Sequence, residues 1–153
     1  MRIRWADEQD ADALAQVFFD AVRKGPSPYT EAERAAWLPD APELPQWRKR
    51  IGQLHTAVAQ VDGTYAGFMT IEPGGYIDLA FILHRFRGQG VFRALYTQIE
   101  EWALTQGEPR LWTFASLTAQ APFKAMGFAV INQKTVERSG QHLRRAQMEK
   151  VLR

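Results

Sequence analysis

The 153-residue sequence contains no cysteine. It therefore has no disulfide framework, no thiolate nucleophile and no zinc site built on cysteine ligands. The three histidines, His55, His84 and His142, do not have the spacing of metal ligands. We therefore expect no bound metal.

The sequence also has little excess charge and no long hydrophobic run. Its formal net charge is only +2, which is too small to predict nucleic-acid binding. No apolar segment is long enough to span a membrane, and residues 1–5 lack the apolar core of a signal peptide. The length is typical of one domain with its own core. We therefore expect a single cytoplasmic domain over residues 1–153 that binds neither nucleic acid nor membrane.

Hydrophobic periodicity predicts strands and helices in alternation. The predicted helices cover residues 11–24, 30–38, 46–54, 91–106 and 118–126. The predicted strands cover residues 2–5, 55–61, 64–72, 76–83, 110–115, 128–137 and 141–152. Asp10 is expected to cap the first helix, Thr30 and Glu33 to form a capping box, and Asp62-Gly63 to turn a hairpin. Strand 76–83, the helix after it and strand 110–115 form a βαβ unit, so the fold class is α/β with a mixed, mostly antiparallel sheet covered by helices.

A glycine-rich segment joins this strand to its helix. It reads Arg87-Gly88-Gln89-Gly90-Val91, with Arg85 and Arg93 on either side. Glycines let the backbone turn tightly and approach a ligand closely, and the N–H groups at a helix start bind phosphate. The segment therefore predicts a pyrophosphate site, although a plain glycine turn into a helix remains the alternative.

The order of elements around this segment resembles the GNAT superfamily of N-acetyltransferases. The likeness spans nearly the whole chain, and its most specific part is the coenzyme A loop, Q/R-x-x-G-x-G/A, which Arg87, Gly88, Gln89, Gly90 and Val91 match. Phe92 stands where the family has glycine or alanine, so its ring either crowds the coenzyme or points inward. The segment 125–128, Ala-Met-Gly-Phe, resembles the family's second landmark.

This resemblance implies an enzyme that transfers an acetyl group from acetyl-coenzyme A to an amine, with no metal. The coenzyme would lie between strands 76–83 and 110–115. Backbone groups of Phe81, Ile82 and Leu83 would bind the pantetheine and the acetyl carbonyl, where an N–H can stabilise the oxyanion. The amine would attack directly, without a covalent enzyme intermediate.

A base must take a proton from the attacking amine. Asp78 is the main candidate, because some family members carry an acidic base at the matching place and apolar residues flank it here. The alternative is an aspartate that faces solvent or pairs with an arginine. Glu72 and His84 are weaker candidates.

The leaving thiolate is stabilised in many family members by a tyrosine, at the position of Phe123 in this chain. Ser116 stands where the family often has asparagine, and its hydroxyl is a candidate to bind the pantetheine or relay a proton. The alternative role of Ser116 is to cap the following helix together with Thr118.

The acceptor is expected to enter across the first two helices and the C-terminal hairpin. Tyr29 and Trp37 are the candidate acceptor-binding residues, although aromatic residues at helical spacing are more often core. Acidic residues that would suit an amine lie in the same region: Asp20, Glu31, Glu33, Asp40 and Glu43.

Two alternatives to an active enzyme remain open. Phe92 and Phe123 favour a catalytically inactive GNAT fold that binds coenzyme A as a sensor or interaction module. The basic residues Arg144, Arg145 and Lys150 would serve a nucleic-acid binder, against which the near-balanced charge argues. A homodimer is expected only by analogy with the family.

Overall fold

The computed structural model describes residues 1–153, and its helices and strands follow the predicted order with one exception. The helices are α1 (Ala11–Arg23), α2 (Glu31–Trp37), α3 (Leu44–Gly52), α4 (Val91–Thr105) and α5 (Leu117–Ala125), with short 3-10 helices η1 (Glu8–Asp10) and η2 (His84–Phe86). The strands are β1 (Arg2–Trp5), β2 (His55–Val61), β3 (Thr64–Ile71), β4 (Tyr76–Ile77), β5 (Ala80–Ile82), β6 (Arg110–Ser116), β7 (Ala129–Arg138) and β8 (Gln141–Val151). None of the helices is both long and apolar enough to cross a membrane.

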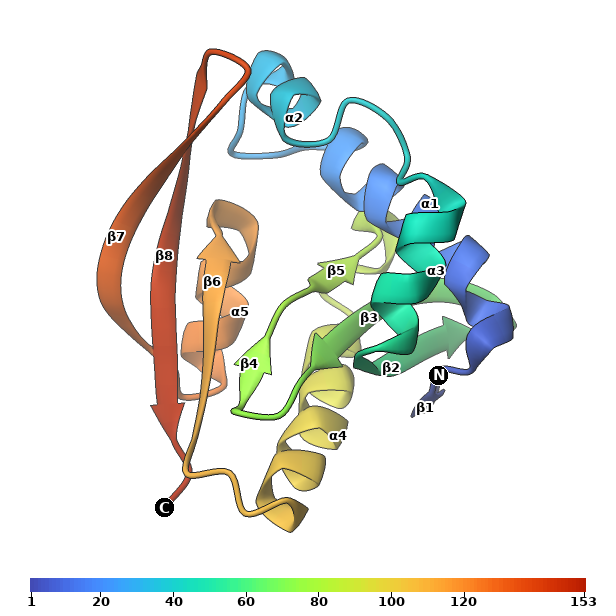
Figure 1. The fold of residues 1–153 in the computed structure, drawn as a ribbon, viewed down its shortest axis with the longest axis vertical. Helices are drawn as coiled ribbons and strands as arrows, with labels where there is room; N and C mark the ends of the chain where they lie inside the picture. Colours follow the sequence, from blue (N-terminus) through green and yellow to red (C-terminus); the bar gives the residue numbers. More distant parts are fainter.

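The exception is the strand predicted over residues 76–83, which is broken at Asp78 and Leu79 into β4 and β5. β4 pairs in parallel with β6, whereas β5 pairs antiparallel with β3. The chain thus crosses from a sheet of order β4-β6-β8-β7 to one of order β1-β2-β3-β5. Figure 1 shows β5 and β6 diverging from this crossing. A single straight strand cannot pair with two diverging partners, which is why the prediction of one continuous strand was wrong.

Two buried threonine hydroxyls satisfy backbone groups at the crossing. Thr70 Oγ1 accepts the N–H of Leu79 at 2.9 Å, and the hydroxyl of Thr113 donates to Ile77 O at 2.8 Å. Buried backbone groups that leave a strand ladder need such partners. These two hydrogen bonds therefore stabilise the break in the strand.

Alternate residues of β2 and β3 pack against helices on opposite faces of their sheet. Val58 and Phe68 lie in a core with α1 and α3, whereas Ala57 and Met69 lie in a larger core with α4. The larger core continues to Phe123 of α5 and to the second sheet. Figure 1 shows α1 and α3 on one side of β2 and β3, and α2 beside the turn of the β7–β8 hairpin.

The predicted helix starts are confirmed in part. The capping box of α2 is present, since Thr30 Oγ1 accepts the N–H of Glu33 and Glu33 Oε1 accepts the N–H of Thr30. Asp10, in contrast, occupies the N-cap position of α1 without a side-chain capping bond. Its carboxylate instead accepts two hydrogen bonds from Arg4, at 2.7 and 2.8 Å, and one from Tyr65 at 2.6 Å. The Arg4 guanidinium holds the pKa of Asp10 well below its usual range. This ion pair, in which the carboxylate is buried and the guanidinium partly exposed, joins β1 to the start of α1.

Candidate active site

Two cavities adjoin at the crossing between the sheets. The first, here called the loop cavity, has a volume of about 300 Å³ and is lined by Arg87, Gly88, Gly90, Val91 and Phe92 among others. The second, the sheet cavity, has a volume of about 320 Å³ and lies against Asp78 and β8. Six residues line both cavities: Tyr29, Trp37, Ala80, Phe81, Ser116 and Ala119. The shared residues place the two cavities side by side.

The glycine-rich loop forms the outer end of the loop cavity. Gly88 and Gly90 have φ angles of +76° and +82°, and a Cβ on either would meet nothing within 4 Å. Gly90 is the N-cap of α4 and provides no side-chain cap. The first N–H groups of α4 therefore have no partner within the helix, and such groups form a site for an anion.

Arg87 holds the loop against the body of the fold. It is half-buried, and its Nε donates to Ile82 O at 3.3 Å, while Nη2 lies 3.5 Å from Ala21 O. Burial lowers the pKa of Arg87. Gln89 lines neither cavity, and its side chain donates to Arg85 O at 2.9 Å. Both side chains thus tie the loop to its neighbours, and the backbone faces the cavity.

Phe92 is half-buried at the wall of the loop cavity. Its ring packs edge-to-face on Phe123, with 5.0 Å between the ring centres. Phe123 is 1% exposed and packs in turn on Phe128. The ring of Phe92 is therefore held against the core, and the cavity stays open beside it. Phe123 itself lines the sheet cavity.

The backbone of β5 has one free N–H group on the side that faces the loop cavity. The N–H of Leu83 donates to Ala66 O of β3 at 2.9 Å. Backbone groups of an antiparallel strand alternate in direction, so those of Phe81 also face β3, and the N–H of Ile82 faces away from it. β5 is an edge strand on that side. Of the three predicted backbone contacts, only Ile82 presents a free N–H to the loop cavity.

Asp78 lies in the break between β4 and β5 and lines the sheet cavity. Its Oδ2 accepts a hydrogen bond from Arg50 Nη2 at 2.7 Å. The carboxylate thus pairs with an arginine, as the alternative role expected, and also lines the cavity. Its role as the base stays a prediction. Glu72 and His84 line neither cavity.

Ser116 and Tyr29 meet at the start of α5, on the wall shared by the cavities. Ser116 Oγ accepts the N–H of Ala119 at 3.3 Å and so caps α5. The Tyr29 hydroxyl accepts the N–H of Leu117 at 2.9 Å and donates to Arg144 O at 2.5 Å. Burial raises the pKa of Tyr29. Tyr29 therefore joins α5 to β8 with both hydrogen-bonding positions of its hydroxyl occupied.

A family model described as an acetyltransferase (GNAT) domain matches residues 26–152 of the sequence. The chain belongs to the GNAT acetyltransferase family. The matched range contains the loop, the crossing and every residue of the two cavities except part of α1. No curated protein sequence matches the chain.

Solved structures confirm the predicted GNAT fold. A GCN5-related N-acetyltransferase from Rhodopseudomonas palustris superposes with a TM-score of 0.90 at 24% identity, over 99% of this chain and 95% of the other. A ribosomal-protein-alanine N-acetyltransferase from Brucella melitensis gives 0.75 at 23% identity, over 99% and 100%. A phosphinothricin acetyltransferase from Sinorhizobium meliloti, solved with acetyl-coenzyme A, gives 0.77 at 18% identity, over 99% and 88%.

The charges that line the sheet cavity of this GNAT protein differ from the expectation drawn from its acidic residues. Tyr29 and Trp37 do line both cavities, and their rings pack edge-to-face at 5.8 Å. None of the five acidic residues expected near the acceptor lines either cavity: Asp20, Glu31, Glu33, Asp40 and Glu43. Four arginines line the sheet cavity instead: Arg50, Arg138, Arg144 and Arg145. No motif marks them, because α3 and the β7–β8 hairpin meet only in the fold.

Replacing Tyr29 with phenylalanine is expected to lower the free energy of unfolding by about 1–3 kcal/mol, because it leaves the partly buried N–H of Leu117 without its partner. Tyr76→Phe is a matched control, since the Tyr76 hydroxyl makes no hydrogen bond to the protein. Urea unfolding of the two variants measures the difference. Equal stability of Tyr29→Phe and wild type would show that the hydroxyl does not tie α5 to β8.

Proposed function

We propose that this GNAT protein transfers an acetyl group from acetyl-coenzyme A to the amino group of a small molecule, with residues 1–153 acting as one catalytic domain. The observation that carries the proposal is that the two cavities lie next to each other. The loop cavity also ends at the start of α4, whose free N–H groups suit an anion. The donor would occupy the loop cavity and the acceptor the sheet cavity. Their reacting groups would then meet at the shared wall, held in position for attack.

The loop and β5 supply the donor's contacts in this proposal. The pyrophosphate would lie on the N–H groups of residues 88–93, where the dipole of α4 favours negative charge. Arg93, which lines the loop cavity and has no ion pair, adds positive charge. The free N–H of Ile82 would bind the acetyl or pantetheine carbonyl. An N–H aimed at the developing oxyanion is worth about 3–4 kcal/mol in other acyl transfers.

The proposed reaction has two steps, the attack of the amine on the acetyl group and the departure of coenzyme A. The neutral amine nitrogen attacks the acetyl carbonyl carbon, and a tetrahedral intermediate forms. The carbon–sulfur bond then breaks, the nitrogen loses a proton, and coenzyme A leaves as a thiolate that gains a proton. The products are the acetylated amine and free coenzyme A.

Two side chains are proposed to move these protons. Asp78, at the wall of the sheet cavity, would accept the proton of the amine, directly or through water. Ser116 is placed on the shared wall, and its Oγ accepts the N–H of Ala119, which leaves its own hydrogen free to reach the sulfur. Phe123 carries no proton to donate, and the hydrogen of Tyr29 is committed to Arg144 O.

The test is an acetyl-transfer assay with acetyl-coenzyme A and a panel of small amines. Free thiol measures coenzyme A release, and mass spectrometry identifies the acetylated product. We expect release that depends on an amine and exceeds hydrolysis of acetyl-coenzyme A alone. Tight coenzyme binding without transfer to any amine would contradict the proposal and favour the inactive, coenzyme-binding alternative that Phe123 supports.

A further inference from the structure

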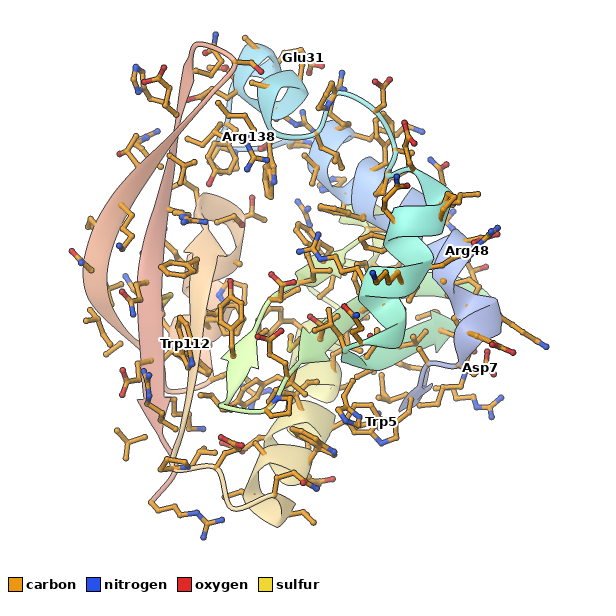
Figure 2. The ribbon with its side chains drawn as sticks, in the orientation of Figure 1. Trp5, Asp7, Glu31, Arg48, Trp112 and Arg138 are labelled. Carbon is orange, nitrogen blue, oxygen red and sulfur yellow. The ribbon has the colours of Figure 1, made fainter.

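The charges around the sheet cavity are unbalanced. Its wall carries one carboxylate, that of Asp78, and four guanidinium groups: Arg50, Arg138, Arg144 and Arg145. Asp78 pairs with Arg50. The other three arginines have no acidic partner, although Arg138 donates to Trp37 O at 3.2 Å, between the β7–β8 hairpin and α2 (Figure 2).

Arg145 is the least satisfied of these groups. Its Nε is shielded from solvent and has no hydrogen-bond partner. The guanidinium lies over the ring of Phe114, 4.4 Å from the ring centre. A guanidinium binds carboxylates and phosphates with two parallel hydrogen bonds, and it retains its charge in a dry site. No hydrogen bond within the protein uses the Nε donor of Arg145, and its guanidinium lines the cavity.

A second cation lies beside Arg145, at an exposed position that does not line the cavity. Lys134 of β7 stands directly opposite Arg145 in the ladder with β8, and its Nζ lies 5.7 Å from the centre of the same Phe114 ring. Like charges placed directly opposite on two strands are destabilising. An anion bound between them would relieve this repulsion.

Outside the cavity, some arginines are paired with acids at short distances, as in Arg48 with Asp12 at 2.7 Å and Arg110 with Glu149 at 2.9 Å. In the cavity wall, only Arg50 has such a partner. Tyr76 lines the same cavity and packs on Phe114, and burial raises the pKa of its hydroxyl. Asp78 and Arg145 thus line one cavity together with Tyr76.

We propose that the acceptor is a small amine that also carries an acidic group, and that Arg145 binds this acid while the amine lies toward Asp78. The proposal rests on the function proposed above and specifies its substrate class. A cavity of about 320 Å³ suits a small molecule. The aromatic side chains of Phe18, Trp37 and Phe81 would pack against the remainder of the acceptor.

The test compares acceptors that differ only in the acid. Each set contains an amino acid, its carboxamide and the amine that lacks the carboxyl group, and kcat/KM is measured with saturating acetyl-coenzyme A. Losing hydrogen bonds to a charged group in a dry site lowers kcat/KM by about 100-fold. We therefore expect the acid to be preferred over its amide and amine by about that factor.

Variants of Arg145 assign the preference to one residue. Arg145→Gln should reduce the preference to near one, and Arg145→Lys, which keeps the charge but not the two-pronged geometry, should restore part of it. Both variants should keep the KM for acetyl-coenzyme A. Arg110→Gln is the control, because Arg110 lines neither cavity and should leave the preference unchanged.

Three results would overturn the proposal. Equal use of acids, amides and amines by the wild type would refute the acidic acceptor and leave the acetyltransferase function standing. A preference that persists in both Arg145 variants would refute the role of Arg145. Absence of transfer to every amine tested would contradict this inference and the proposed function together.

Discussion

Replacing Gly90 with tryptophan is expected to weaken binding of acetyl-coenzyme A by at least about 100-fold, because the indole would occupy the space where the pyrophosphate meets the start of α4. The fold should survive, since a Cβ at Gly90 meets no atom within 4 Å. The positive φ of this residue costs about 1–2 kcal/mol for any other side chain. Calorimetric titration measures the loss of affinity, and circular dichroism verifies the fold.

Gly63→Trp is the matched control for this substitution. Gly63 has a φ of +78°, a Cβ added to it would meet nothing within 4 Å, and it lies in the β2–β3 hairpin outside both cavities. This variant should lose similar stability and keep its affinity for the coenzyme. Unchanged affinity in Gly90→Trp, or equal loss in both variants, would show that the loop does not bind the coenzyme.

Replacing Asp78 with asparagine should lower kcat by about 100- to 10,000-fold, the usual contribution of a positioned base. The affinity for acetyl-coenzyme A should not change, because Asp78 lies in the sheet cavity and not in the loop cavity. The ion pair that is lost contributes little stability, since the Arg50 side chain is 45% exposed. Steady-state kinetics across pH measures the effect, and the activity that depends on the deprotonated carboxylate should disappear.

The Arg50→Gln variant distinguishes a catalytic role of Asp78 from the effect of its ion pair with Arg50. This variant breaks the same ion pair but retains the carboxylate of Asp78, so its kcat should fall far less. A rate for Asp78→Asn that matches the wild type at every pH would remove Asp78 from the mechanism. An equal fall in Arg50→Gln would assign the effect to the ion pair instead.

The order of the helices and strands could be predicted because each carries its own local signal. The α2 capping box and the glycines of the loop are examples, since Thr30, Glu33, Gly88 and Gly90 act through their immediate neighbours. The prediction that Asp10 caps α1 was wrong because it also relied on a local signal alone. A capping role is a local property, and Asp10 does accept the nearby N–H of Asp7. Its side-chain partners, Arg4 and Tyr65, belong to strands brought together by the fold.

The break at Asp78 and the charge of the sheet cavity could not be predicted from local pattern. The apolar run from Tyr76 to Leu83 is typical of one strand, and only the divergence of its two partners, β3 and β6, divides it. The acidic residues of the N-terminal segment that was expected to bind the acceptor do not line the sheet cavity. Arg145 reaches that wall from the other end of the chain.

Thermal unfolding with and without acetyl-coenzyme A tests the central claim most directly, because a ligand that binds only the folded protein must raise its stability. At a concentration of one hundred times the dissociation constant, the gain is about 2.7 kcal/mol. We expect a rise of the midpoint that depends on the dose of acetyl-coenzyme A and is absent in Gly90→Trp. No rise for the wild type at millimolar acetyl-coenzyme A would mean that the loop cavity does not hold the coenzyme, and would contradict the account.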